Sequence, residues 1–173
     1  ASGKAAMGAI SLTGAAQTTP VDAQNGATGT SATPSVSVTT VADRAWVIDV
    51  VGFRSTANGA PTGTAGAGQT ERWSQYTESG GTAPNIRGKG SHEGPKTPAG
   101  AVTMNWSLSA SVDWATSAVS IRPNTGTVYY KNKIDVVTFD SAATSNSAIY
   151  SWSHTTTGTD RLLVVSVSIQ KAL

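Results

Sequence analysis

Residues 102–109 read VTMNWSLS, and their side chains alternate strictly between apolar and polar. The apolar positions share one face of an extended chain and the polar positions share the other: Val102, Met104, Trp106 and Leu108 against Thr103, Asn105, Ser107 and Ser109. This period of two is typical of a half-buried antiparallel strand. The segment therefore predicts β structure here and not helix.

The same period recurs between turn-rich segments along the chain, and no stretch sustains a helical period. Residues 45–53 (AWVIDVVGF) are apolar on both faces except at Asp49, which predicts a central strand. Residues 20–29, 54–69 and 78–100 are expected to be loops. Strands are expected over 7–14, 35–41, 45–53, 71–77, 102–109, 113–121, 128–131, 135–139, 148–154 and 161–170. This spacing predicts one all-β domain over residues 1–173, an antiparallel two-sheet sandwich of jelly-roll type.

The amino-acid composition excludes several classes of function. Only 13% of the residues are charged, about half of what globular proteins carry, and the net charge is +2. Such a weakly charged surface lacks the basic patch on which nucleic-acid binding depends, so no nucleic-acid partner is expected. The absence of cysteine excludes disulfides, a cysteine nucleophile and thiolate zinc sites.

The apolar segments are short. No purely apolar run is longer than that of residues 162–165, whereas a membrane-spanning helix needs about 20 residues, so no membrane insertion is expected. The first residues have no apolar core long enough for a signal peptide, so the sequence is expected to be processed or cut from a longer chain. Abundant Ser, Thr and Gly with no Cys favour an extracellular or cell-surface location.

Three segments carry a resemblance to a known family: residues 10–22 (ISLTGAAQTTPVD), 104–123 (MNWSLSASVDWATSAVSIRP) and 152–168 (WSHTTTGTDRLLVVSVS). They are similar to a β-sandwich repeat of large secreted surface proteins of bacteria and archaea. The resemblance covers most of the chain, implies a β-sandwich and brings no catalytic residues with it. In the repeat, the segment like 152–168 comes first and the one like 104–123 comes last; here the order is reversed. The middle of the repeat, a Tyr-Asn-Gly strand and an aromatic strand ending in a Pro-Gly turn, is absent.

A sandwich that lacks two adjacent strands has an open edge and an uncovered apolar strip, and such edges recruit other strands. The last predicted strand presents a matching apolar face: Leu163, Val165, Val167 and Ile169. Burying each of these side chains is worth about 1.5–3 kcal/mol, so they are expected at a subunit interface. Either the reordered strands close one domain within the chain, as a circular permutation would, or the terminal strands complete a neighbouring copy in a head-to-tail contact.

The expected function is therefore that of an extracellular structural subunit that assembles with itself into a filament, a pilus-like fibre or a surface layer. The alternative is a carbohydrate-binding or adhesive β-sandwich module of a larger secreted protein, with polysaccharide as its partner. Trp46 and Trp106 are expected in the core. The candidates for stacking on a ligand are Trp73, Tyr76, Tyr129 and Tyr130. An interface also selects Trp and Tyr, so the aromatic residues alone leave both functions open.

Catalytic residues are scarce. Ser153, His154 and Asp160 are the elements of a triad, but they lie on one predicted strand and its turn, with Ser153 and His154 on opposite sides. His92 and Glu93 form a lone pair in a Gly/Pro-rich segment, where solvated side chains are expected and not a transition-metal site. The chain is therefore not expected to be an enzyme.

Two further motifs concern cations and glycans. Four aspartates lie at predicted strand ends and could serve calcium: Asp22, Asp43, Asp140 and Asp160. Aspartate in a turn usually caps its own backbone, so no cofactor is expected and structural calcium stays the alternative. Asn105-Trp106-Ser107 fits the N-glycosylation pattern, and its use depends on whether Asn105 faces water.

Overall fold

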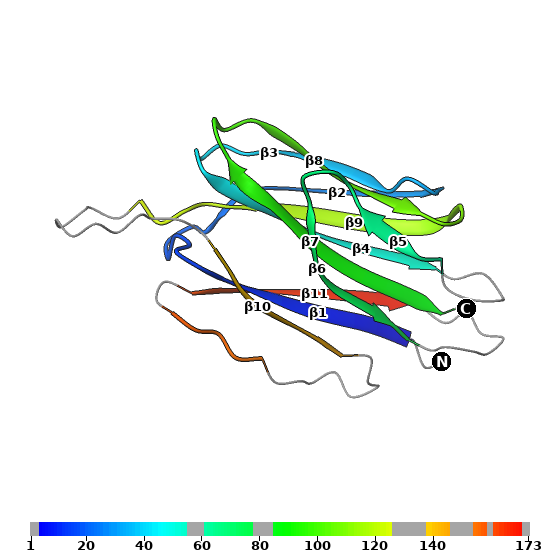
Figure 1. Ribbon diagram of the computed structural model, residues 1–173. Coiled ribbons are helices and arrows are strands. Elements are labelled where there is room, and N and C mark those ends of the chain that lie inside the picture. Colours follow the sequence, from blue (N-terminus) through cyan, green and yellow to red (C-terminus); the bar gives the residue numbers. More distant parts are fainter. Residues whose placement is uncertain are drawn as a thin grey trace.

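The computed structural model describes residues 4–54, 61–77, 85–125, 138–145, 154–158 and 161–170; within these ranges the side chains of Lys4, 138–141, 143–145 and 167–170 are left out of the description. The described part of the chain is all-β, and its strands are antiparallel (Figure 1). They are β1 (Lys4–Thr13), β2 (Val21–Ser31), β3 (Ser35–Thr39), β4 (Ala45–Arg54), β5 (Gly63–Ala65), β6 (Thr70–Tyr76), β7 (Ile86–Lys96), β8 (Ala101–Leu108), β9 (Val112–Ile121), β10 (Thr138–Ser145) and β11 (Leu162–Gln170).

The described ladders form three sheets, in a sandwich-like arrangement. A central five-stranded sheet has the order β2-β9-β4-β7-β6, and two three-stranded sheets have the orders β3-β8-β5 and β10-β1-β11. The expected all-β sandwich of antiparallel sheets is therefore confirmed, with three sheets where two were expected. Jelly-roll connectivity stays a prediction.

Strand β4 explains the third sheet, because its two faces are covered by different partners. Val47 packs with β3 and β8 on one face, together with Val51 and Phe53 further along the strand. Ile48, on the other face, packs with β1. A strand that is apolar on both sides needs a layer on both sides, so the prediction of a central strand over 45–53 is confirmed.

All three segments expected to be loops contain strand residues: β2 overlaps 20–29, the short β5 lies within 54–69, and β7 lies within 78–100. The sequence of β2, VDAQNGATGTS, and that of β7, IRGKGSHEGPK, are rich in residues that favour turns. Yet β2 pairs along its length with β9, and β7 lies between β4 and β6. Pairing with strongly apolar neighbours overrides the weak local preference. Of the other expected strands, 128–131 and most of 148–154 lie outside the described residues, and 135–139 overlaps the start of β10.

Candidate assembly surface

The apolar C-terminal segment forms β11, which lies beside β1 (Figure 1). Its ladder runs without a register shift from Lys4 opposite Gln170 to Leu12 opposite Leu162. The order β10-β1-β11 leaves the second edge of β11 without a partner among the described strands. Strand β11 therefore closes a ladder within its own chain and still has one edge that none of the described strands pairs with.

The side chains of β11 divide between two faces. Leu162 and Val164 point inward and pack against the core around Ile48. Leu163 and Val165 point outward and are 45% and 50% exposed. The side chains of Val167 and Ile169 lie outside the description, although their backbones pair with β1. The interface predicted for these four residues stays a prediction.

A trough of about 590 Å³ runs along the free edge of β11. The β11 segment from Val164 to Ser166 forms one wall, and β4, β9 and β2 form the floor. The described residues on the β11-facing side of that floor are uncharged: Gln24, Gly26, Ile48, Val50, Ser117 and Val119. The trough exists because the three-stranded sheet of β11 covers only part of the five-stranded sheet.

The expected exposure of Trp73 is wrong. Its side chain is only 4% exposed and fills the space between β1 and β7, where Cβ atoms built on Gly8, Gly88 or Gly90 would crowd the indole. A ring enclosed by backbone cannot stack on a sugar. Tyr76 is half-buried, with the guanidinium of Arg87 4.9 Å from its ring centroid. Tyr129 and Tyr130 lie outside the described residues.

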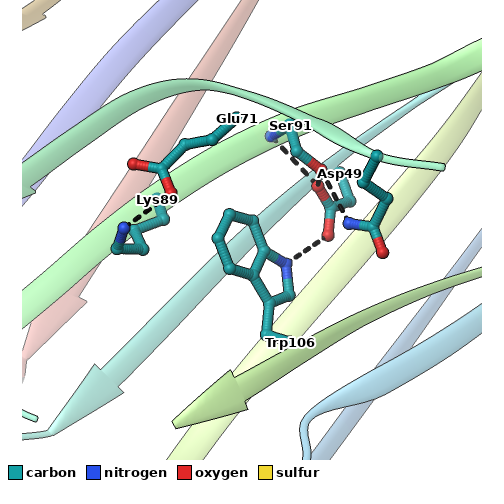
Figure 2. A network of polar contacts seen from close by, with 6 residues as sticks. Asp49, Glu71, Lys89, Ser91 and Trp106 are labelled. Carbon is teal, nitrogen blue, oxygen red and sulfur yellow. Dashed lines mark hydrogen bonds and ion pairs between the residues drawn. The ribbon is translucent and has the colours of Figure 1, made fainter. Parts of the chain in front are cut away.

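Asp49 forms a polar network that the sequence did not reveal (Figure 2). Its carboxylate accepts the backbone N–H of Ser91 at 3.1 Å, the hydroxyl of Ser91 at 2.5 Å and the indole N–H of Trp106 at 2.6 Å. Ser91 belongs to β7 and Trp106 to β8, so the carboxylate ties the central sheet to the β3-β8-β5 sheet. Burial raises the pKa of Asp49 to about 6, although these hydrogen bonds act to lower it.

Lys89 lies on the other side of the Trp106 indole from Asp49 (Figure 2). Its ammonium group is 2.7 Å from a carboxylate oxygen of Glu71 and 5.6 Å from the Trp106 ring centroid. The Lys89 side chain is 8% exposed, so its charge is neutralised where water is scarce. The arrangement is that of a paired buried charge.

The prediction that His92 is solvated is wrong, because its side chain is buried in β7. Its ring stacks on Trp46 with centroids 4.5 Å apart, and its Nδ1 accepts the Nε–H of Arg72 at 2.8 Å. Burial and the positive charge of Arg72 lower the pKa of His92 to about 4. Trp46 is half-buried against the core, and Trp106 lies within the core as expected.

Asp22 does not cap its own turn; it clamps the distant segment around residues 41–42. Its carboxylate accepts the backbone N–H groups of Val41 and Ala42, at 2.6 and 3.0 Å, and contacts Ser120 and Arg122. Burial acts to raise the pKa of Asp22, but these donors outweigh it and the pKa is lowered. An oxygen pair engaged by this many donors has little capacity left for a cation.

The remaining candidate residues for calcium binding, catalysis and glycosylation are dispersed. Asp43 is exposed, and the side chains of Asp140 and Asp160 are outside the description. Within the described ranges no three His, Cys, Asp or Glu side chains are grouped to hold a metal ion. His154 is half-buried, whereas Ser153 and Asp160 lie outside the described residues. Asn105 is half-buried on the outer face of β8, where its amide donates to the carbonyl of Thr103 at 3.4 Å.

Comparisons with known proteins add no family. No protein-family model matches the chain, and neither the curated proteins nor the solved structures provide a match. In the described part of the chain, no helix has the length and apolarity to cross a membrane.

Proposed function

We propose that this chain is a structural module of an extracellular or cell-surface assembly, joined to copies of itself by β-strand addition. The single observation that supports the proposal is the free edge of β11, which pairs with β1 on one side only among the described strands. A free edge presents a row of unpaired N–H and C=O groups that a strand of another molecule can satisfy. Repeated head-to-tail, such a contact generates a filament or a layer. We also propose jelly-roll connectivity for the sandwich, and the proposed assembly does not depend on it.

The β11 edge lacks the features that usually protect a sheet edge from pairing with another strand. Proteins protect sheet edges with charged side chains, prolines and bulges. The edge strand β6 has Glu71, Arg72 and a register shift, and the edge strand β10 has Asp140 and a register shift in its ladder with β1. The sequence of β11, LLVVSVSIQ, contains no charge and no proline, and its ladder has no shift. The edge strand β2 has Asp22 and a register shift, whereas β3 and β5 have no charge, proline or shift but span only five and three residues. Strand β11, with nine residues, is therefore the longest described edge strand without any of these protections.

A pair of proline variants tests the edge. Successive N–H groups of a strand point to opposite neighbours, so one of Val164→Pro and Val165→Pro removes a donor to β1 and the other removes a donor at the free edge. We expect the variant that keeps nearly wild-type stability in urea to lose assembly, as measured by sedimentation and electron microscopy. The less stable variant is the internal control for damage to the β1 ladder.

Two results would overturn the proposal. One is a stable proline variant that forms the same particles as the wild type. The other is a wild-type chain that stays monomeric at all concentrations, which, combined with retention on polysaccharide, would favour the carbohydrate-binding alternative.

A further inference from the structure

The edges of two sheets meet where β2 lies beside β3 (Figure 1). Strand β2 ends the central sheet and β3 ends the β3-β8-β5 sheet, and neither has a second ladder among the described strands. Ala23 and Ala27 of β2 pack against the core cluster that contains Val36 and Val38 of β3. Each of these adjacent edges could pair with a strand of another molecule.

The ladder between β3 and β8 shows which backbone groups of β3 face its open edge. Pro34 and Thr40, which flank β3, both hydrogen-bond through their backbones to residues on the β8 side. In an antiparallel strand both backbone groups of one residue point to the same neighbour, and successive residues alternate. Ser37 lies three residues from each of them, so its N–H and C=O groups point away from β8.

The carboxamide of Asn25 occupies backbone groups of both edge strands. Its Nδ2 donates to the carbonyl of Ser37 at 2.9 Å, and its Oδ1 accepts the backbone N–H of Gly26 in β2, also at 2.9 Å. An incoming strand would have to displace this side chain before it could bond to the Ser37 carbonyl. The contact is therefore an internal substitute for one hydrogen bond of a further strand.

Asp22 of β2 makes a similar contact just beyond β3. Its carboxylate accepts the backbone N–H groups of residues 41–42. Residues three apart in a regular strand lie on opposite faces. The register shift between Val21 and Ala23 inserts Asp22 as an extra residue opposite β9 and reverses that alternation. The bulge thus lets Asp22 and Asn25 reach the same neighbouring segment.

We infer that Asn25 and Asp22 keep the edges of β2 and β3 from pairing with other molecules, so that copies of this chain join at the β11 edge and not at this second side. The inference rests on the proposed function, because it explains why assembly through β11 would extend in one direction without branching. Strand β3 depends on these side chains because its own sequence, SVSVT, contains no charge and no proline.

Asn25→Ala tests the inference, because this exposed side chain can be removed without opening a cavity. It is combined with the stable proline variant, in which the β11 edge is blocked. We expect it to strengthen self-association about tenfold in sedimentation, the size expected when one or two hydrogen bonds become available between copies. Asn105→Ala is the matched control. It removes a carboxamide that bonds the Thr103 carbonyl of its own strand, β8, which has ladders on both sides, and it should leave the proline variant monomeric.

A cysteine at position 37 shows which edge is used, because the chain has no cysteine of its own. Ser37→Cys keeps the carbonyl that Asn25 binds and places a thiol on the exposed face of β3. Antiparallel pairing of β3 with β3 of a second copy should bring two such thiols together. Oxidation should therefore give disulfide-linked dimers when Asn25→Ala is present and few when Asn25 is kept. Ser107→Cys, on the exposed face of β8, should give few dimers in either case.

The outcomes separate this inference from the proposed function. If Asn25→Ala leaves the proline variant as monomeric as before, the inference is wrong, although assembly through β11 stands. If the combined variant associates but Ser37→Cys forms no more dimers than Ser107→Cys, another surface is used and the inference is equally wrong. If the proline variant assembles while Asn25 is kept, the proposed function fails, and the dependence of the Ser37→Cys dimers on Asn25 still decides the inference.

Discussion

Asp49→Asn should change how stability depends on pH. The folded-state pKa of about 6 exceeds the ordinary value of 3.8, so the folded chain binds this proton more tightly than the unfolded chain. The contribution of Asp49 is then fully present below about pH 4 and is lost as pH rises through 6. At about 1.4 kcal/mol per pKa unit, the loss amounts to about 3 kcal/mol.

The Asp49→Asn variant removes this pH dependence of stability but also loses a hydrogen bond. Its NH₂ group cannot accept the Trp106 N–H, so one buried donor is left unsatisfied, at about 1–3 kcal/mol. We therefore expect Asp49→Asn to be less stable than the wild type at pH 4 and close to it at pH 8. The difference in unfolding free energy between the two proteins should change by about 3 kcal/mol over that range.

Urea unfolding at one-unit intervals from pH 4 to 8 measures this difference directly. Trp106→Phe is the companion variant, because it keeps the carboxylate and removes one donor, which should raise the pKa of Asp49 further and steepen the loss. A difference between wild type and Asp49→Asn that stays constant across this range would refute the reasoning, since it would mean that Asp49 titrates alike in the folded and unfolded chains.

Three further predictions concern other buried groups. His92→Gln should remove a pH dependence of stability whose sign is opposite to that from Asp49. Because the pKa of His92 in the folded chain is lowered to about 4, stability is lost as pH falls from 6.5 towards 4. The variant should therefore resist acid better than the wild type in urea titrations. Gly8→Ala should destabilise by about 1–3 kcal/mol, because its Cβ would overlap the Trp73 indole, and Trp73→Leu in the same chain should recover part of the loss, as thermal melts can check. Asp22→Ala should cost about 1–3 kcal/mol at pH 7 by leaving the N–H groups of Val41 and Ala42 unsatisfied, and its penalty should shrink in acid, where the wild-type carboxylate is protonated.

The sequence predicted well the features that lie within one strand. The alternation from Val102 to Leu108 placed Trp106 in the core, and the two apolar faces of β4 placed it between neighbours. Both patterns indicate burial directly, because an apolar side chain must pack against another element on its own face of the strand. The same pattern in β4 also carried the signal for a third sheet, which the two-sheet expectation overlooked.

Features that join distant strands could not be predicted in this way. Asp49 meets Ser91 and Trp106, which are 42 and 57 residues away in the sequence. The burial of Trp73 depends on Gly8 in β1 and on Gly88 and Gly90 in β7, and those glycines made β7 resemble a loop. Only the fold shows that a glycine is small because an indole lies above it. The trough likewise results from the unequal widths of two sheets.

The antiparallel ladder of β1 and β11 also determines how the protein would bear tension. Lys4 lies opposite Gln170, so both strands can be gripped at the same end of the ladder. Force applied there would unzip the hydrogen bonds one after another, which is a weak mechanical geometry. A strand held lengthwise beside β11 would instead be sheared, with all its bonds loaded together. A fibre built from this module would therefore be strong only if its load passed between copies and not through the two ends of this ladder.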